Sequence, residues 1–278
     1  MRIGTWSSLT QGIPGASSAD DLDGAAGWVP ERDLRGEAKS LQAHQLEDFD
    51  VEHLCEREWK LVEPAFDARF GQRRFSFLDV GGGNGRFADR LLRRYPGAKA
   101  TVLDSARMLL AQNVPHPRKR LVLGSAEHLA VLFHERFDLI AFNWALHHFV
   151  TSTYSATRRL QREILGQARA LLAPGGAISV FENLYDGSIF DGLPGRLIFH
   201  ATSSQPLAPL ARRLGANTAG CGVCFLSRRQ WEQEARRAGL RVDSFVNGFP
   251  KALHPAIRAA LGIRSARHGQ FFLVTADR

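Results

Sequence analysis

An acid followed by closely spaced glycines stands at residues 79–85, which read D-V-G-G-G-N-G. Glycine adopts positive φ angles, and it lacks the Cβ atom that would keep a ligand away from the backbone. A helix that begins directly after Gly85 would also turn its free N–H groups toward such a ligand. These residue types and their spacing predict a nucleotide-binding turn.

The elements on either side of this turn support that interpretation. Phe75, Phe77, Leu78 and Val80 place four large apolar residues within six, which predicts a short strand buried on both faces. The segment 86–92 then takes up the spacing of apolar residues that is typical of a helix. Strand, glycine turn and helix together form the layout of a nucleotide site.

The spacing of the glycines distinguishes between two kinds of nucleotide site. The dinucleotide fingerprint G-x-G-x-x-G, read from Gly81, would need glycine where Arg86 stands, which argues against NAD or FAD. The pattern D-x-G-x-G-x-G instead resembles motif I of the class I S-adenosylmethionine (AdoMet) dependent methyltransferases. Asp104 ends the next apolar run, nineteen residues after Gly85, where a carboxylate can accept hydrogen bonds from ribose hydroxyls.

The resemblance implies AdoMet as cofactor and S-adenosylhomocysteine as product. It assigns the methionine portion to Asp79 and the motif glycines, and the ribose to Asp104. The family usually has Asp-Ala beside the adenine, and here Ser125 replaces the aspartate with a weaker acceptor. The implied cofactor residues are Asp79, Gly81, Gly83, Gly85, Asp104, Met108, Ser125, Ala126, Glu127, Asn143 and Trp144.

A second set of reactive residues follows two later apolar runs. His147 and His148 belong to a Leu-His-His sequence that is frequent in the resembled family after strand four, and Glu182 follows strand five. The family's sheet order makes these strands neighbours at the edge where ligands bind. A histidine oriented by a carboxylate suits removal of a proton from a hydroxyl. We predict His147 or His148 as base and Glu182 as orienting acid, with simple packing or turn capping as the alternative.

Helical and strand patterns alternate regularly after the glycine motif, which predicts a parallel sheet with helices on both faces. Ser105 and Ser227 are predicted to cap helices. The expected fold is α/β and Rossmann-like, with a seven-stranded, mostly parallel sheet whose last two strands pair antiparallel, as in the family. Strands are predicted at 75–80, 100–104, 121–124, 137–142, 177–181, 241–246 and 271–274.

The regions outside this alternation are assigned to the substrate. Residues 1–70 are predicted to form an N-terminal arm and a helical lid, although the helices could simply pack on the sheet. Residues 71–278 then form the methyltransferase domain. An insertion at about 184–226, after strand five, is expected to cap the substrate.

Charge is distributed unevenly along the 278 residues, whose net charge is +8. Residues 1–60 carry 12 acids and 6 bases, which leaves 30 bases and 16 acids in the rest. A basic body attracts anionic substrates or nucleic acid, but no aromatic and basic residues interleave, so nucleic acid is the weaker expectation. Arg196, Arg212 and Arg213 of the insertion are candidates to meet an anionic group on the substrate.

Cysteine and hydropathy patterns exclude other classes of protein. Cys221 and Cys224 form a C-x-x-C pair, but Cys55 is the third and last cysteine and lies far from them, so no metal site is expected. No apolar run approaches the roughly 20 residues that span a bilayer, and the first residues lack a signal-peptide core. We expect a soluble, cytoplasmic protein without a membrane role.

The function predicted from these patterns is AdoMet-dependent methyl transfer to a small-molecule acceptor by direct displacement, on oxygen, in biosynthetic (natural-product) metabolism. Methylation of nitrogen or carbon is the first alternative, because motif I binds the cofactor and does not specify the acceptor atom. A nucleic-acid-directed enzyme or a nonenzymatic AdoMet-binding module is the second. The sequence names neither the acceptor nor the oligomeric state, and a homodimer is compatible with it.

Overall fold

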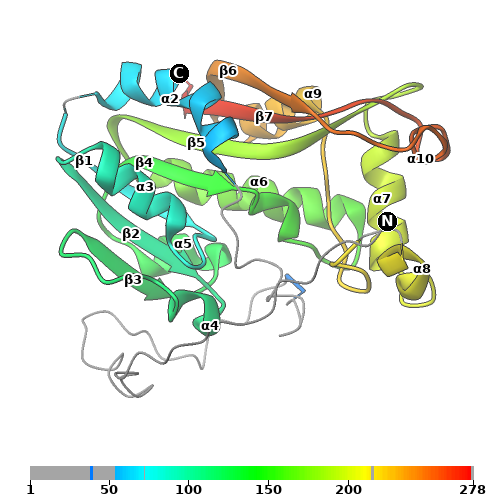
Figure 1. Ribbon diagram of the computed structural model, residues 1–278, viewed down its shortest axis with the longest axis horizontal. Helices are drawn as coiled ribbons and strands as arrows, with labels where there is room; N and C mark the ends of the chain where they lie inside the picture. The colour runs from blue at the N-terminus through cyan, green and yellow to red at the C-terminus, as the bar shows by residue number, and fades with distance from the viewer. Residues whose placement is uncertain (1–37, 40–53, 72, 214–215, 277–278) are drawn as a thin grey trace, which may run out of the picture. The chain divides into compact units, whose positions relative to one another are not determined.

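A seven-stranded sheet forms the centre of the chain in the computed structural model, which describes residues 38–39, 54–71, 73–213 and 216–276 (Figure 1). Its order is β3-β2-β1-β4-β5-β7-β6; β7 pairs antiparallel with both β5 and β6, and the other neighbouring strands pair in parallel. The strands are β1 Phe75–Val80, β2 Ala98–Asp104, β3 Lys119–Leu123, β4 Phe137–Asn143, β5 Leu172–Gly187, β6 Leu240–Pro250 and β7 Ile263–Thr275. The predicted Rossmann-like fold is confirmed.

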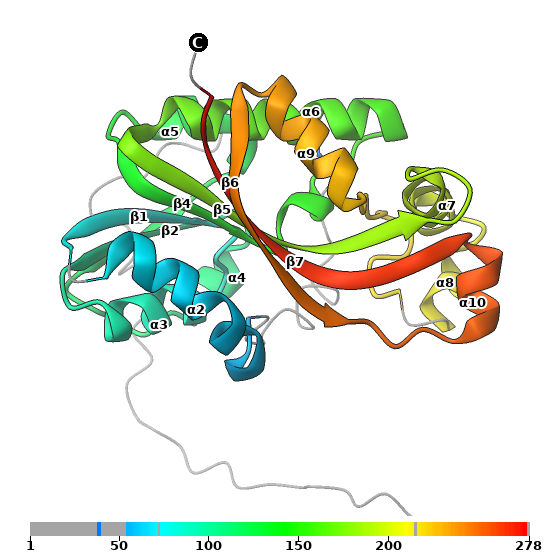
Figure 2. The same cartoon turned by 90° about the horizontal axis from the view of Figure 1, so that it is seen from above.

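The central strands are apolar on both faces because helices cover both. Phe77, Leu78 and Val80 of β1 are at most 1% exposed. Figure 2 shows α2 (Glu56–Phe70) and α3 (Arg86–Arg94) on one face of the sheet, with α5 (Leu129–Leu132), α6 (Tyr154–Ala170) and α9 (Arg228–Arg237) on the other. This coverage on two sides explains why the strand sequences are continuous apolar runs rather than alternating ones.

Helix α2 packs directly on the sheet. Trp59, Val62, Phe66 and Phe70 form its buried face, and the Phe66 ring lies 5.0 Å from the ring of Phe272 in β7. Burial of each such side chain contributes about 1.5–3 kcal/mol to folding. The predicted lid also includes residues 1–37 and 40–53, which lie outside the described residues, so the division into lid and catalytic domain stays a prediction.

The strands β5, β7 and β6 extend well beyond the parallel part of the sheet. β5 continues to Gly187 because Asn183 to Asp186 pair with β7, from His268 back to Ser265. The irregular region after strand five therefore begins later than position 184. It contains α7 (Leu193–Ser203) and α8 (Ala208–Arg213), while α10 (Pro255–Ala260) joins β6 to β7.

The two predicted helix caps have different outcomes. Ser227 accepts from the Gln230 backbone in a complete capping box at the start of α9, as predicted. The prediction for Ser105 is wrong, because α4 (Arg107–Leu110) begins later, after Ala106. The Asp104 carboxylate accepts from the Ala106 N–H at 2.8 Å and so takes over the role of the serine.

Candidate active site

The glycine turn after β1 has the backbone that the motif predicts. Gly81, Gly83 and Gly85 have φ angles of 71°, 48° and 74°, in the left-handed region where only glycine is comfortable. A Cβ atom on Gly81 would also lie 2.9 Å from the Cβ of Ala145, in the segment after β4. The turn therefore brings the ends of β1 and β4 close together.

Two residues of this turn were missed in the sequence. A Cβ atom on Gly82 would lie 2.6 Å from Oδ2 of Asp79, so the carboxyl needs glycine at this position too. The Asn113 side chain donates to the Gly83 carbonyl at 2.8 Å and to the Leu110 carbonyl at 3.0 Å, which fixes the turn from the α4 side. The run of three glycines was a signal for Gly82, whereas nothing in the sequence singled out Asn113.

Asp79 is a buried acid with an unsatisfied oxygen. It is 1% exposed, and its Oδ2 atom has no hydrogen-bond partner among the described residues. Burial raises the pKa of Asp79 to about 7, the charge of Asp104 raises it further, and the side chain of Asn143 opposes both. A buried carboxyl of this kind is costly to fold unless a cationic or donating group approaches it.

Asp104 lies against the same turn at the end of β2. Its Oδ2 atom accepts from the Gly83 N–H at 2.9 Å, so the carboxylate fixes the turn whatever else it binds. Burial raises the pKa of Asp104, and the backbone N–H groups that it accepts from act in the opposite direction. A carboxylate has lone pairs beyond those used here, so a ribose role for Asp104 remains compatible and stays a prediction.

The residues predicted for the adenine lie on neighbouring turns. Met108 on α4 is 40% exposed. Ser125 caps the short 3-10 helix η4 (Ala126–His128) by accepting from the Glu127 N–H, while Ala126 is buried in the core. The Glu127 carboxylate accepts from the Ala38 N–H at 3.3 Å. Their contact with adenine stays a prediction.

The segment after β4 is strained. Trp144 has a φ of 50° and is the non-glycine residue with positive φ in the described part of the chain. Its N–H donates to the Phe181 carbonyl at 2.8 Å, which ties the turn to β5. The buried amide of the neighbouring Asn143 lies close enough to Asp79 to lower its pKa, but neither of its polar atoms makes a well-formed hydrogen bond among the described residues. Strain and unsatisfied polar atoms at one strand end are typical of a ligand site.

His147 and Glu182 meet as predicted. His147 lies in the 3-10 turn η5 (Leu146–His148), and its Nδ1 atom lies 2.6 Å from Oε2 of Glu182. Glu182 is fully buried and His147 is 5% exposed. The backbone N–H of His147 also donates to the Glu182 carboxylate, at 3.3 Å. Ring and backbone are thus both oriented by one buried acid.

The surroundings of Glu182 determine the pKa of its carboxyl group. Burial raises the pKa of Glu182 to about 8, while the positive charge of His148 and backbone N–H donors lower it less strongly. The centroid of the His148 ring lies 4.0 Å from that of His147. Of the two predicted histidines, His147 is the one whose ring nitrogen contacts the Glu182 carboxylate.

The last residues of the predicted insertion pack against this pair. The Phe225 ring lies 4.7 Å from the ring of His147 and 5.0 Å from that of Tyr185. The Cys224 N–H donates to the His147 carbonyl at 3.0 Å. These contacts shield one side of the histidine from water. The pKa of the Cys224 thiol is raised to about 12 by burial, which leaves it an inert core group.

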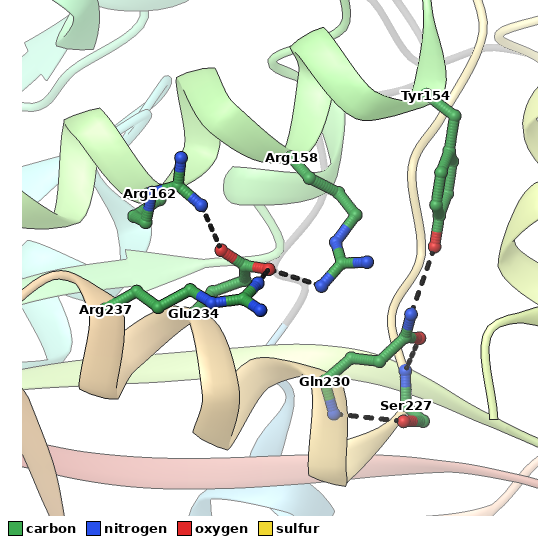
Figure 3. Close-up of polar contacts among 7 residues, drawn as sticks. All are labelled: Tyr154, Arg158, Arg162, Ser227, Gln230, Glu234 and Arg237. Atoms are coloured by element: carbon green, nitrogen blue, oxygen red, sulfur yellow. Dashed lines mark hydrogen bonds and ion pairs between the residues drawn. The ribbon is translucent and has the colours of Figure 1, made fainter.

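Helix α9 anchors this segment to α6 (Figure 3). Glu234 is 1% exposed and is surrounded by the guanidinium groups of Arg158, Arg162 and Arg237. At the start of α9, the Gln230 amide donates to the Tyr154 hydroxyl at 3.3 Å. Removing one partner of such a buried ion pair typically costs about 3–5 kcal/mol, so these contacts tie α9 firmly to α6.

Four further side chains meet along β5, β7 and the residue after β6. Asn183 faces His268 across the β5–β7 ladder, and the His268 ring packs 4.9 Å from the ring of Trp144. Lys251, directly after β6, donates from Nζ to Oδ1 of Asn183 at 2.9 Å. The Lys251 ammonium lies 5.9 Å from the centroid of the Tyr185 ring. Local residue patterns do not indicate that these residues meet, because the long β5–β7–β6 pairing brings them together.

The arginines predicted to meet an anionic group lie elsewhere. Arg196 stacks over the Tyr154 ring at 5.1 Å, and Arg212 and Arg213 are exposed at the end of α8. A charged groove of about 540 Å³ lies beside α9, where carboxylates alternate with arginines and pair with two of them. Its lining residues are Asp186, Asp191, Arg228, Arg229, Glu232, Arg236, Arg264 and Arg267.

The described residues contain neither a metal-binding cluster nor a membrane-spanning helix. No group of three or more histidine, cysteine or acidic side chains there is placed to hold a metal ion. No helix in the same part of the chain is both long and apolar enough to cross a bilayer.

A family profile described as a methyltransferase domain matches residues 50–244. The chain belongs to this methyltransferase family. The ubiquinone/menaquinone biosynthesis C-methyltransferase of Paracoccus denitrificans is 38% identical over 164 residues, which cover 55% of this chain. The match spans 62% of that relative, less than two thirds of its length.

Solved structures of methyltransferase-family proteins share the fold. A protein named as a sarcosine dimethylglycine methyltransferase, from Galdieria sulphuraria, is 16% identical with a TM-score of 0.53, and the match covers 80% of this chain and 85% of that one. The cyclopropane synthase MmaA2 from Mycobacterium tuberculosis is 16% identical with a TM-score of 0.52, and the shares are 81% and 87%. At this identity the likeness concerns the fold alone, which is that of the class I AdoMet-dependent methyltransferases.

Proposed function

We propose that this methyltransferase transfers a methyl group from AdoMet to an oxygen atom of a small-molecule acceptor, with His147 as base and Glu182 orienting it. The observation that carries the proposal is the buried contact of 2.6 Å between His147 Nδ1 and Glu182 Oε2. It lies at the carboxyl edge of the parallel part of the sheet, where β1 and β4 end and β5 continues toward Gly187. This edge is where ligands bind in open α/β sheets.

The chain fits the proposed cofactor at the glycine turn. The unsatisfied Oδ2 atom of Asp79 suits the ammonium of the cofactor's methionine portion, and the left-handed glycines let that portion approach the backbone. The buried amide of Asn143 offers a further donor and acceptor beside Asp79. When bound, AdoMet supplies a methyl group that is already activated on a sulfonium.

The chain's own task is then positioning, exclusion of water and control of one proton. Positioning alone can lower a barrier by about 7–11 kcal/mol in favourable cases. With Nδ1 held by the Glu182 carboxylate, Nε2 of His147 takes the proton of the acceptor hydroxyl as the oxygen attacks. The negative carboxylate stabilises the imidazolium that forms. Phe225 and the buried walls around the pair keep this exchange out of bulk water.

Carbon methylation is the second candidate, and one observation favours it. The 38% identical relative is named a C-methyltransferase. In that case the same His147–Glu182 pair would remove a proton from an acidic carbon instead of a hydroxyl. An aromatic ring or an enol carries both kinds of nucleophile, so one acceptor class serves both candidates.

The test is to incubate the protein with AdoMet carrying a ¹³C-labelled methyl group and panels of phenols, hydroxy acids and 1,3-dicarbonyl compounds. We expect label in an ether or ester methyl group, identified from its carbon shift. Label on carbon would favour the second candidate. Label in RNA or DNA offered in parallel, with none in the small molecules, would overturn the small-molecule proposal. We do not expect that outcome, because acidic side chains lie among the arginines of the groove beside α9 and break up its positive charge.

A further inference from the structure

Lys251 is a cation that contacts Asn183, the residue after Glu182, and no carboxylate of the described residues is bound to it. Its backbone N–H donates to the Ala266 carbonyl, which fixes it against β7. From there the side chain reaches Asn183, the residue after Glu182, with a contact of 2.9 Å between Nζ and Oδ1. The ammonium is thereby held against the residue that follows Glu182, and the charge of Glu182 acts on it electrostatically.

The bonding of this ammonium is incomplete within the described residues. A lysine ammonium has three N–H donors, and the structure shows one of them used, by the neutral amide of Asn183. The side chain is mostly buried, and burial lowers the pKa of Lys251 while the nearby Glu182 raises it less strongly. No ion pair joins Lys251 to an acid in the described part of the chain. A buried cation in this situation is costly unless a ligand supplies the negative charge.

Flat rings stand between Lys251 and His147. The ammonium lies over the Tyr185 ring, Tyr185 packs on Phe225, and Phe225 packs on His147. Burial raises the pKa of Tyr185 to about 12, so its hydroxyl stays a neutral donor. On the opposite strand, the His268 ring lies next to Trp144. Such surroundings suit a planar ligand that carries polar atoms at its edge.

We infer that Lys251 binds an anionic oxygen of a planar, conjugated acceptor, such as an aromatic carboxylate, whose nucleophilic hydroxyl or ring carbon lies at His147. The inference rests on the proposed function and adds the substrate class to it. It replaces Arg196, Arg212 and Arg213 as the cations that would meet an anionic substrate. Lys251 acts as a binding residue, and the proton still passes to His147.

A purely structural role for Lys251 predicts different behaviour. If the lysine only tied β6 to Asn183, its removal would lower stability without changing the preference for charged ligands. Lys251→Arg keeps the charge, and Lys251→Met keeps much of the volume without it. Lys99→Met is a matched control. Lys99 is exposed on β2, and four strands separate β2 from β6 in the sheet order.

The experiment measures binding of the three monohydroxybenzoates, and of the corresponding hydroxybenzamides, to the full chain saturated with S-adenosylhomocysteine. Calorimetry should show at least one hydroxybenzoate bound about ten- to hundredfold more tightly than its neutral amide. Lys251→Met should abolish this preference, whereas Lys251→Arg and Lys99→Met should retain it. Melting curves and S-adenosylhomocysteine affinity verify that each variant is folded.

Three results would overturn the inference. They are equal binding of acids and amides by the unmodified chain, a preference that survives in folded Lys251→Met, and no binding of any hydroxybenzoate to the S-adenosylhomocysteine complex. Failure to bind S-adenosylhomocysteine in the first place would instead contradict the proposed function. If Lys251→Met does not fold, the preference measured on the unmodified chain and on Lys251→Arg still decides.

Discussion

The cofactor end and the acceptor end of the candidate site are built in different ways. Most of the cofactor end comes from one stretch, residues 79–113, whose decisive features are backbone features: a strand end, left-handed glycines and a fixed turn. The Asn143 side chain adds a buried amide from the end of β4. The acceptor end joins His147, Glu182, Phe225 and Lys251 from four separate parts of the chain. The first can recur wherever the motif recurs, whereas the second depends on how the long β5–β7–β6 extension and the insertion pack. Cofactor class and acceptor class are therefore separable properties of this protein.

Loss of the proposed base should have the largest effect on turnover while leaving cofactor binding intact. We expect His147→Ala to lower kcat by about 10²–10⁴-fold, because the acceptor proton loses its receiver. S-adenosylhomocysteine affinity, measured by calorimetry, should stay almost unchanged. His148→Ala is the control from the same turn and should lower kcat less. Equal effects of the two substitutions would mean that the histidine bonded to Glu182 has no special role.

A substitution in the glycine turn should weaken cofactor binding. Gly81→Val places a branched side chain at a φ of 71° and next to Ala145, so S-adenosylhomocysteine affinity should fall on the order of a hundredfold. Gly166→Ala in α6 is the control, because a Cβ atom there meets nothing within 4 Å. The control should bind normally and be slightly more stable. Normal binding by Gly81→Val would show that the cofactor does not use this turn.

Cofactor affinity should depend on pH through Asp79. The pKa of this carboxyl is about 7 in the unliganded protein, and an ammonium beside it favours the ionised form. Below that value binding must expel a proton, so affinity should rise about twentyfold between pH 5.5 and 7.5 and then level off. Asp79→Asn should bind weakly at every pH. A pH-independent affinity of the unmodified chain would remove Asp79 from the site.

Turnover should depend on pH through the His147–Glu182 pair. His147 accepts a proton only when its partner carboxyl is ionised, and the pKa of Glu182 is about 8. The kcat value at saturating substrate should therefore rise about tenfold between pH 7 and pH 9. In Glu182→Gln this rise should disappear together with most of the activity. A bell-shaped profile centred near pH 6 would contradict this assignment.

The same contrast explains what the sequence could predict. All seven strands and the glycine turn follow from local apolar runs and glycine spacing, and both are found in the structure. The pairing of His147 with Glu182 was also predicted, because the family's sheet order makes their strands neighbours. Choosing between His147 and His148 required the conformation of η5, which local residue types do not specify.

Other residues escaped prediction for identifiable reasons. Lys251 and His268 reach the site only through the register of the antiparallel β5–β7 pair, which depends on long-range packing. Ser105 looked like a cap, but the neighbouring Asp104 carboxylate is the better acceptor for the Ala106 N–H. Arg196 belonged to the right segment, but it stacks on Tyr154 instead of meeting the His147–Glu182 pair.

The central claim is that the glycine turn holds an AdoMet-type cofactor next to a buried base. Calorimetric titration of the full chain with S-adenosylhomocysteine, with NADH as control, tests it most directly. We predict binding in the micromolar range for S-adenosylhomocysteine, weakened strongly by Gly81→Val, and none for NADH. Binding of NADH, or no binding of S-adenosylhomocysteine by the folded protein, would contradict the account.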